Sequence, residues 1–432
     1  MTPQSSFMVV APIRKAREGE LRRLLAGMNR APGHADPANP LIPFQALQSL
    51  HFARFVVLDD ATTGDIAVYG LPAPLYPPAL AFLGEIDGDR DAFMHDLVKQ
   101  AGNGLRRLFL CCEGFTESTD PVRWMDEHEH RPAAFYVNWR GRTMRQVREE
   151  SALATAVASY LRANQDVPRR PPREIHATLR RHVEAEAAAG RLTLTPEEPT
   201  PVRWWIAHVV NLVTLPLIAL VLLPVLLLYL PIFAYQLRRR ERSDPQVIPR
   251  PDTEHVAQLA ELEDHELTNQ FNALGSVKPG RFRHWLLVAV LWLIDFGARH
   301  LYFRGRLARV HTIHAARWVF LDGGRRVLFA SNYDGSLESY MDDFINKVSF
   351  GLNLAFSNGV GYPSTRWLVF DGARDEQKFK SVLRRHQLPS QVWYNGHLGF
   401  TAHQLDRNAR LRRGLRSPTL SDGELVEWCR LL

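Results

Sequence analysis

Two Asp-Gly pairs occupy matching places in two similar stretches of the chain. The segment LAFLGEIDGDRDAFMHDL (80–97) aligns without a gap with VLFASNYDGSLESYMDDF (327–344), so that Asp87 matches Asp334. A carboxylate that ends a strand and faces a substrate can carry a proton between substrate atoms. An Asp-Gly pair is also typical of a turn that opens a helix. The two aspartates are therefore candidate acid–base groups, with a turn or helix start as the alternative.

Two arginines are duplicated in the same way. HFARFVVLD (51–59) matches HAARWVFLD (314–322), which places Arg54 and Arg317 in otherwise apolar strands. A buried cation can stabilise negative charge that develops during a reaction. The alternative is a structural ion pair with a duplicated carboxylate. The duplicated carboxylates are Asp59 with Asp322, and Asp96 with Asp343.

The similarity extends beyond these segments and indicates an internal repeat. The offset stays constant from residue 80 to residue 115, and after a loop the segment 135–142 aligns with 366–373. A fixed offset over such a length is typical of a tandem duplication, and we interpret the chain as one.

The repeated unit predicts an α+β fold class. Each copy reads as strand, strand, helix, strand and helix; the N-terminal copy adds a strand and a helix before these, and the C-terminal copy adds a strand at 391–395. The order β-α-β-β-α-β is ferredoxin-like. The strands are apolar on both faces, as expected for sheets covered by helices on one side and by a second sheet on the other. We therefore expect two tandem ferredoxin-like halves that form a pseudo-dimer.

This organisation resembles the dimeric α+β barrel superfamily, and several short motifs resemble its dye-decolorising peroxidase branch. GEIDG (84–88) is similar to the peroxidase motif that ends in the distal aspartate, and AH (402–403) followed by RRG (412–414) is similar to the context of the proximal histidine. The resemblance implies haem, with His403 as the axial iron ligand. It also implies Asp334 or Asp87 as the proton shuttle, and Arg317 or Arg54 as the stabilising cation.

One block of the sequence is long and apolar enough for a membrane. Within residues 204–236, the stretch from Val209 to Tyr235 contains no ionisable group except tyrosines. This stretch is longer than a spanning helix needs. Tryptophans at its start and arginines at its end suit the two borders of a bilayer. Pro216, Pro224 and Pro231 lie inside it, and basic residues flank both ends. We expect a proline-bent hairpin that re-enters the membrane, with both soluble halves on the cytoplasmic face.

The remaining boundaries follow from composition. We expect an N-terminal domain at 1–165, a linker and helix at 166–203, the membrane segment at 204–236, a polar linker with an acidic helix at 237–283, a short interfacial or membrane helix at 284–304, and a C-terminal domain at 305–432.

Charge and cysteine content narrow the partners. The net charge is +7. The three cysteines form neither a disulfide framework nor a CxxC metal-binding pattern, so we expect a reducing compartment. The sequence contains no GxGxxG, P-loop, HExxH or GxSxG motif. Beside a membrane segment, the arginine-rich C-terminal stretch favours anionic lipid over nucleic acid.

Two functions are compatible with these features. The first is a membrane-bound, haem-dependent and peroxidase-like oxidoreductase that acts on a peroxide or a lipophilic small molecule. The alternative is a non-catalytic membrane protein that binds a lipid-like ligand or a partner enzyme through its barrel cleft.

Overall fold

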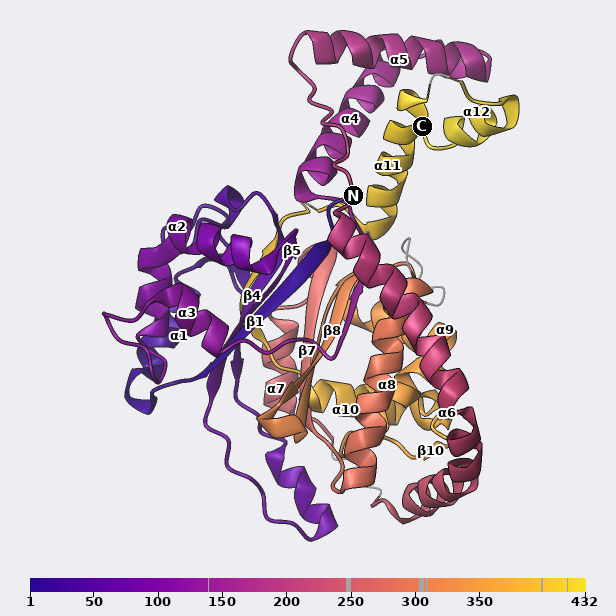
Figure 1. Cartoon of the computed structure of the whole chain (residues 1–432). Coiled ribbons are helices and arrows are strands. Elements are labelled where there is room, and N and C mark those ends of the chain that lie inside the picture. The colour runs from indigo at the N-terminus through magenta and orange to yellow at the C-terminus, as the bar shows by residue number, and fades with distance from the viewer. Residues whose placement is uncertain (139, 246–249, 303–306, 308–309, 398, 418) are drawn as a thin grey trace.

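The computed structural model has a mixed α+β fold with two large sheets at its centre (Figure 1). It describes residues 1–138, 140–245, 250–302, 307, 310–397, 399–417 and 419–432. The larger sheet has the strand order β1-β5-β4-β12-β3-β2, and the smaller has the order β6-β8-β9-β7. The strands β10 (Thr365–Arg366) and β11 (Phe370–Asp371) form a separate short hairpin.

The larger sheet is built mainly from the N-terminal part of the chain. Its elements are β1 (Gln4–Pro12), α1 (Glu18–Ala26), β2 (Asn29–Ala31), β3 (His34–Ala35), β4 (Leu50–Leu58), β5 (Ala79–Asp87), α2 (Arg90–Phe109) and α3 (Pro121–Glu127). β1 pairs antiparallel with β5, and β5 pairs antiparallel with β4. On the other edge of β1, the amide of His130 donates to the carbonyl of Met8 at 2.8 Å. The segment at His130 thus lies as a short fourth strand-like segment next to β1, beside β5 and β4.

The smaller sheet has the same arrangement. Its elements are β7 (Thr268–Ser276), α8 (Arg281–His300), β8 (Ile313–Leu321), β9 (Arg326–Asp334), α9 (Leu337–Phe356) and α10 (Glu376–His386). β7 pairs with β9 and β9 with β8, while the amide of Leu388 donates to the carbonyl of Asn272 at the other edge of β7 (2.9 Å). The long helices α2 and α9 each lose helical geometry at matching positions of the repeat, Ala101 and Val348.

Each sheet also receives one strand from the other part of the chain. β6 (Ala134–Val137) pairs with β8, and β12 (Ser390–Asn395) pairs with β4. The expected alignment of 135–142 with 366–373 is therefore wrong, because β12 and not the β10-β11 hairpin is the counterpart of β6. The helices that follow these strands also begin alike: Thr143 and Thr401 each form a capping box with the glutamine three residues later.

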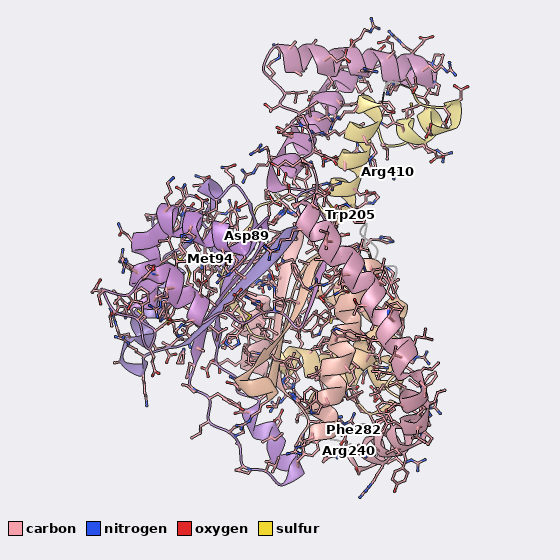
Figure 2. The ribbon with its side chains drawn as sticks, viewed as in Figure 1. Asp89, Met94, Trp205, Arg240, Phe282 and Arg410 are labelled. Carbon is pink, nitrogen blue, oxygen red and sulfur yellow. The ribbon has the colours of Figure 1, made fainter. Side chains whose placement is uncertain are left out.

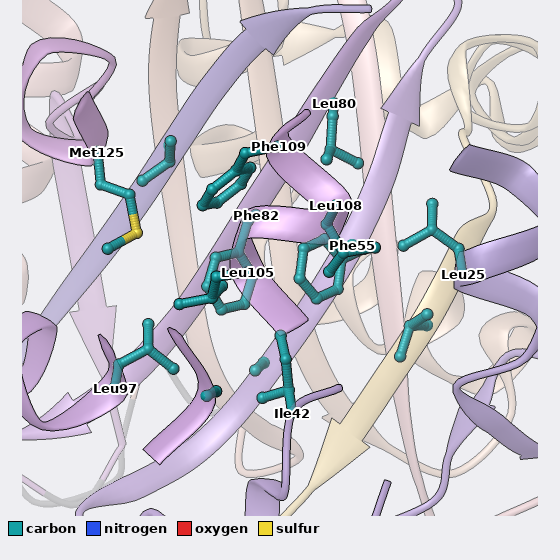
Figure 3. Close-up of a cluster of buried hydrophobic side chains, with 14 of the residues drawn as sticks. Leu25, Ile42, Phe55, Leu80, Phe82, Leu97, Leu105, Leu108, Phe109 and Met125 are labelled. Atoms are coloured by element: carbon teal, nitrogen blue, oxygen red, sulfur yellow. The ribbon is translucent and has the colours of Figure 1, made fainter. Parts of the chain in front are cut away.

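The two sheets pack against each other. One buried cluster contains Met8, Val56 and Leu83 from the larger sheet with Val319 and Leu328 from the smaller. Helices cover the outer faces, which explains why β4 is buried along its whole length. Outside the larger sheet, α1, α2 and α3 form a further apolar core, part of which is shown in Figure 3.

Two stretches differ from the sequence-based expectation. The stretch 237–283, expected as a polar linker, contains β7. The polar residues of this strand suggest a linker, but in the fold these residues, such as Asn272, are buried and hydrogen-bonded. The membrane or interfacial helix expected at 284–304 is α8, which buries Leu287 and Leu291 against the smaller sheet. Hydrophobicity alone does not distinguish such a helix from an interfacial one.

Four helices form a separate group at one end of the molecule, close to both termini (Figure 1). They are α4 (Met144–Ala163), α5 (Pro172–Ala188), α11 (Ala402–Arg416) and α12 (Asp422–Cys429). Leu153, Leu179, Leu411 and Trp428 lie in their common core. The stretch 166–203, expected as a linker and helix, thus contributes α5 to a packed unit.

The apolar block forms one continuous helix, α6 (Val202–Ser243), rather than the expected hairpin. Its three prolines lie inside the helix, where each lacks the amide hydrogen that a regular helix needs, and the helix curves at its lower end in Figure 1. Every residue from Pro216 to Ile232 is exposed. Within the described residues, α6 is the one helix long and apolar enough to cross a membrane. The short α7 (Thr253–Ala260) follows it.

Candidate functional site

Three buried histidines meet where the two sheets adjoin. His51 lies at the start of β4, His314 at the start of β8, and His397 just after β12. Nδ1 of His51 lies 2.9 Å from Nε2 of His397, and the rings of His314 and His397 are centred 5.3 Å apart. We call His51, His314 and His397 the imidazole cluster.

Local irregularities in the strands position two of these side chains. The pairing of β4 with β5 shifts register between Leu50 and Phe52, and that of β8 with β9 shifts between Ile313 and Ala315. A bulge of this kind redirects the side chain of the extra residue, here His51 or His314. The two histidines match in the repeat, so the same device operates in both sheets.

The predicted acid–base groups Asp87 and Asp334 hold the cluster in place. Oδ1 of Asp87 lies 2.8 Å from Nε2 of His51, and Oδ1 of Asp334 lies 2.7 Å from Nε2 of His314. The second oxygen of Asp87 accepts a hydrogen bond from the amide of Met144, and that of Asp334 accepts one from the amide of Ala402. Each aspartate therefore joins an imidazole to the N-terminus of a distant helix, α4 or α11, which is a favourable place for negative charge.

The hydrogen bonds fix the proton positions in the neutral cluster. An ionised Asp87 can only accept, so His51 donates through Nε2 and its Nδ1 must accept from Nε2 of His397. Nδ1 of His397 and Nδ1 of His314 are then unprotonated, and neither has a hydrogen-bond partner among the described side chains and backbone. Burial, followed by the effect of the other two histidines and of Arg142, lowers the pKa of His397 well below its ordinary value. His397 is therefore neutral near pH 7.

The cluster has little free space. His51, His314 and His397 line a cavity of about 20 Å³, which has room for about one water molecule. The cluster can thus hold or pass a proton, but an organic substrate does not fit beside it.

The predicted cations Arg54 and Arg317 lie away from the cluster, between the sheets. Arg317 is opposite Ala330 on β9, four residues from Asp334, and Arg54 is opposite Leu83 on β5, four residues from Asp87. Both side chains are almost completely buried.

Each arginine crosses to the opposite sheet. Arg317 pairs with Glu85 and donates to the carbonyls of Phe7 and Gly84, both at 2.8 Å. Arg54 donates to the side-chain oxygens of Asn272 and Asn332. Burial lowers the pKa of Arg54 to about 10, so it stays charged at neutral pH. The ion pair expected with Asp59, Asp322, Asp96 or Asp343 is wrong for Arg317, because its partner is Glu85.

The structure does not provide a haem site around the predicted residues. His403 is exposed on α11, and the amide of its neighbour Ala402 lies directly on Asp334, so a macrocycle has no space between His403 and that carboxylate. The guanidinium of Arg317 is engaged by Glu85. Among the described residues, no group of three His, Cys, Asp or Glu side chains is arranged to hold a metal ion. These residues therefore do not fit the group that the peroxidase resemblance implies.

A larger, apolar cavity lies on the outer side of the smaller sheet. It has a volume of about 270 Å³ and is bounded by β7, β8 and β9, by α8 and by α9. Side chains that line it include Phe271, Trp318, Phe329, Met341 and Phe344. We call this space the apolar cavity. No sequence pattern marks this cavity, because the apolar residues that line a cavity look the same as those that fill a core.

The matching space of the larger sheet is filled. Gly104 on α2 and Gly351 on α9 match in the repeat, yet a Cβ at Gly104 would lie 1.8 Å from the carbonyl oxygen of Leu41, whereas one at Gly351 would meet nothing within 4 Å. Next to Leu41, Ile42 is completely buried among the side chains of Figure 3. The loop that contains Leu41 and Ile42 thus fills this space beside α2. Among the described residues, no such loop lies beside Gly351 on α9, and the apolar cavity opens there.

The fold and these sites define a mixed α+β protein with a long exposed apolar helix, a buried imidazole cluster and an apolar cavity. Comparisons of the chain with protein-family models, curated proteins and solved structures found no match.

Proposed function

We propose that this protein attaches to one face of a membrane through α6 and binds a lipophilic ligand in the apolar cavity. The observation that carries the proposal is the position of this cavity next to α6. The proposal follows the ligand-binding alternative from the sequence, but it moves the site from the cleft between the sheets, which Met8, Val56 and Val319 fill, to the outer face of the smaller sheet.

The exposed middle of α6 supports attachment to a lipid bilayer. Its residues from Pro216 to Ile232 are nearly all apolar, and none of them is buried in the folded body. An apolar surface of this length is unfavourable in water. Trp204 and Trp205 stand at one end and Arg238, Arg239 and Arg240 at the other, which suits the polar borders of a bilayer. By the same rule, these arginines favour the cytoplasmic face.

Both ends of α6 are fastened to the same folded body. Near its start, the side chain of Asn211 lies 3.0 Å from Nε2 of His300, at the end of α8. Near its end, the carboxylate of Glu241 accepts hydrogen bonds from Thr365, Trp367 and Leu368. Figure 2 shows Arg240 beside Phe282, at the start of α8, and Trp205 at the opposite end of α6.

These attachments favour a helix that lies along one face of the bilayer, with its apolar middle in one leaflet. Leu237 follows Asn211 by 26 positions, which span about 39 Å in a helix. If α6 crossed the bilayer, the two attachment points on one body would have to lie on opposite faces. We therefore place the folded body on one side.

The apolar cavity borders the surface that α6 occupies. Val290 and Ile294 on α8 line the cavity and also belong to the apolar cluster that holds Phe233 and Leu237 of α6. Three further lining residues, Leu293, Leu301 and Phe350, are exposed. A lipophilic molecule could thus pass from the bilayer into the cavity without crossing water. Apolar cavities of about 150 Å³ already hold small hydrocarbons, so the observed volume is sufficient for a ligand or part of one.

We also infer that the chain consists of two ferredoxin-like halves that form a pseudo-dimer. Support comes from the shared order of elements in the two sheets, from the exchange of β6 and β12, and from the equivalent helix irregularities at Ala101 and Val348. In this arrangement the apolar cavity belongs to the C-terminal half alone.

Photochemical labelling tests the proposed function. The full chain is incorporated into neutral lipid vesicles that contain an alkyl diazirine lipid, irradiated and digested, and the labelled residues are identified by mass spectrometry. We expect labels on α6 and also on Met341 and Phe344, which are buried and line the cavity. Labelling of α6 alone would contradict ligand binding in the cavity, and labelling of neither would contradict membrane attachment.

The variant Gly351→Leu provides the matched test. Its side chain is expected to occupy the cavity and to remove the labels from Met341 and Phe344, while labels on α6 remain as an internal standard. Gly102→Leu adds the same side chain to α2 of the other half and should leave the labelling pattern unchanged.

A further inference from the structure

A second cavity lies on the other side of the last turn of α8, where α6 begins. It has a volume of about 170 Å³, and we call it the basic cavity. Polar and aromatic side chains that line it include Arg140, Trp204, His208, Asn211, Arg299 and His300. It is separate from the apolar cavity, which lies along Gly297 and Leu301 of the same helix.

Positive charge in the basic cavity exceeds negative charge. Arg140 and Arg299 line it, and the partner of Arg299 is Asp295 at 2.6 Å. Arg140 donates to the carbonyls of Ala298 and Arg299, which carry no full charge. Burial, and then the nearby Arg299, lower the pKa of Arg140. An anion in this cavity would therefore relieve the repulsion between two cations.

One buried nitrogen in the cavity lacks a partner. His300 is 7% exposed and uses Nε2 to contact Asn211, but its Nδ1 has no hydrogen-bond partner among the described residues. Burial, followed by His208, Arg140 and Arg299, lowers the pKa of His300. A bound anion would reverse this effect, because a protonated Nδ1 could then donate to it.

The cavity lies at the expected level of lipid headgroups. Trp204 lines it and precedes the apolar stretch of α6, and tryptophan is enriched at the border between headgroups and hydrocarbon. The side chain of Arg299 is 53% exposed, so the cavity can be reached from outside.

We propose that the basic cavity binds a phosphate or carboxylate group, and that the group belongs to an anionic lipid of the membrane that α6 enters. Arg299, Arg140 and His300 would contact the anion through charge-assisted hydrogen bonds. The choice of a lipid as the source rests on the proposed membrane attachment, whereas the anion chemistry rests on the cavity alone.

Flotation with vesicles tests the proposal. The full chain is mixed with phosphatidylcholine vesicles with and without phosphatidylglycerol. The protein that floats with the vesicles is then quantified over a range of anionic lipid content. We expect saturable binding of phosphatidylglycerol and a loss of about tenfold or more in Arg299→Gln, because a charge-assisted hydrogen bond is removed. His300→Gln should also weaken binding, and it provides a second variant if Arg299→Gln is poorly folded.

Arg203→Gln is the matched control, because Arg203 is exposed at the same end of α6 but does not line the cavity. Its loss should weaken binding by about fivefold at most, the effect of one cation near an anionic surface. Equal losses in Arg203→Gln and Arg299→Gln would overturn the proposal, because surface charge alone would then explain binding.

Calorimetric titration with inorganic phosphate, in detergent solution, separates the two sources. Binding of phosphate that depends on Arg299, without a preference for phosphatidylglycerol, would support the anion site and overturn its assignment to a lipid. If neither phosphate binding that depends on Arg299 nor a preference for phosphatidylglycerol is found, the anion site itself is overturned. Neither result would affect labelling in the apolar cavity, so this proposal and the proposed function can fail separately.

Discussion

His397 lies in hydrogen-bond contact with His51, although 346 residues separate them in the sequence. The contact brings the loop after β12 onto the start of β4, beside the Asp87 that caps α4. On the other side, His314 and Asp334 connect the smaller sheet to α11 in the same way. The imidazole cluster therefore ties both sheets to the separate group of four helices.

The neutral state of His397 predicts acid sensitivity. Burial depresses the pKa of His397 in the folded chain below its ordinary value of 6.5. Below that pH the unfolded chain binds the extra proton, so stability is present above about pH 6.5 and falls as the pH decreases, by about 1.4 kcal/mol per pH unit for this group. Thermal unfolding in detergent between pH 5 and 8 should show this slope, and His397→Gln should reduce it.

His403→Gln is the control for this measurement. His403 is exposed on α11, so its replacement should leave the pH dependence unchanged. An unchanged slope in His397→Gln would show that other groups, such as the buried His386, cause the acid sensitivity.

The sequence predicts the local features of this structure better than its long-range contacts. The apolar pattern of 51–59 and 314–322 identifies β4 and β8, and the length of the apolar block identifies α6. β7 escapes detection because its polar side chains are buried; Asn272, for example, accepts a hydrogen bond from Arg54 of the facing sheet.

The candidate site depends on such long-range contacts. The partner of Arg317 is 232 residues away and belongs to the other sheet, so no local spacing could reveal it. The repeat does mark His51 and His314, because each lies three residues before the repeated arginine, Arg54 or Arg317. His397 has no histidine partner in the repeat, and nothing in its neighbourhood distinguishes it from other histidines of the chain.

The ion pair between Arg317 and Glu85 predicts a large effect on stability. Replacing Arg317 with leucine leaves the Glu85 carboxylate buried without its cation, which typically costs about 3–5 kcal/mol. The double variant Arg317→Leu, Glu85→Leu should recover part of this loss. Chemical unfolding followed by tryptophan fluorescence measures both.

An exposed ion pair provides the comparison. Arg180 and Glu184 lie on the surface of α5, so Arg180→Leu should change stability by about 1 kcal/mol at most. Similar losses in Arg180→Leu and Arg317→Leu would contradict a special role for the buried pair.

The attachment of both ends of α6 to one body predicts its topology. Single cysteines at Arg203 and Ser243, both exposed, are introduced with Cys429 replaced by serine, since Cys111 and Cys112 are buried. In sealed vesicles, a maleimide that cannot cross the bilayer should label both positions or neither, because both ends lie on the same side. Labelling of one position alone in vesicles of uniform orientation would show that α6 crosses the membrane.

Matched glycines on α2 and α9 predict opposite effects of the same substitution. Gly351→Ala should raise the unfolding temperature, because alanine favours a helix over glycine by about 1 kcal/mol and the new methyl group meets nothing within 4 Å. Gly104→Ala should lower it, because the methyl group would lie 1.8 Å from the carbonyl oxygen of Leu41 and the loop must move. Overpacking of this kind costs about 1–3 kcal/mol and outweighs the gain in helix propensity. Thermal unfolding of the two variants under identical detergent conditions measures the difference. If both substitutions destabilise the protein to the same extent, the space beside Gly351 is filled like that beside Gly104, and the apolar cavity is not available to a ligand.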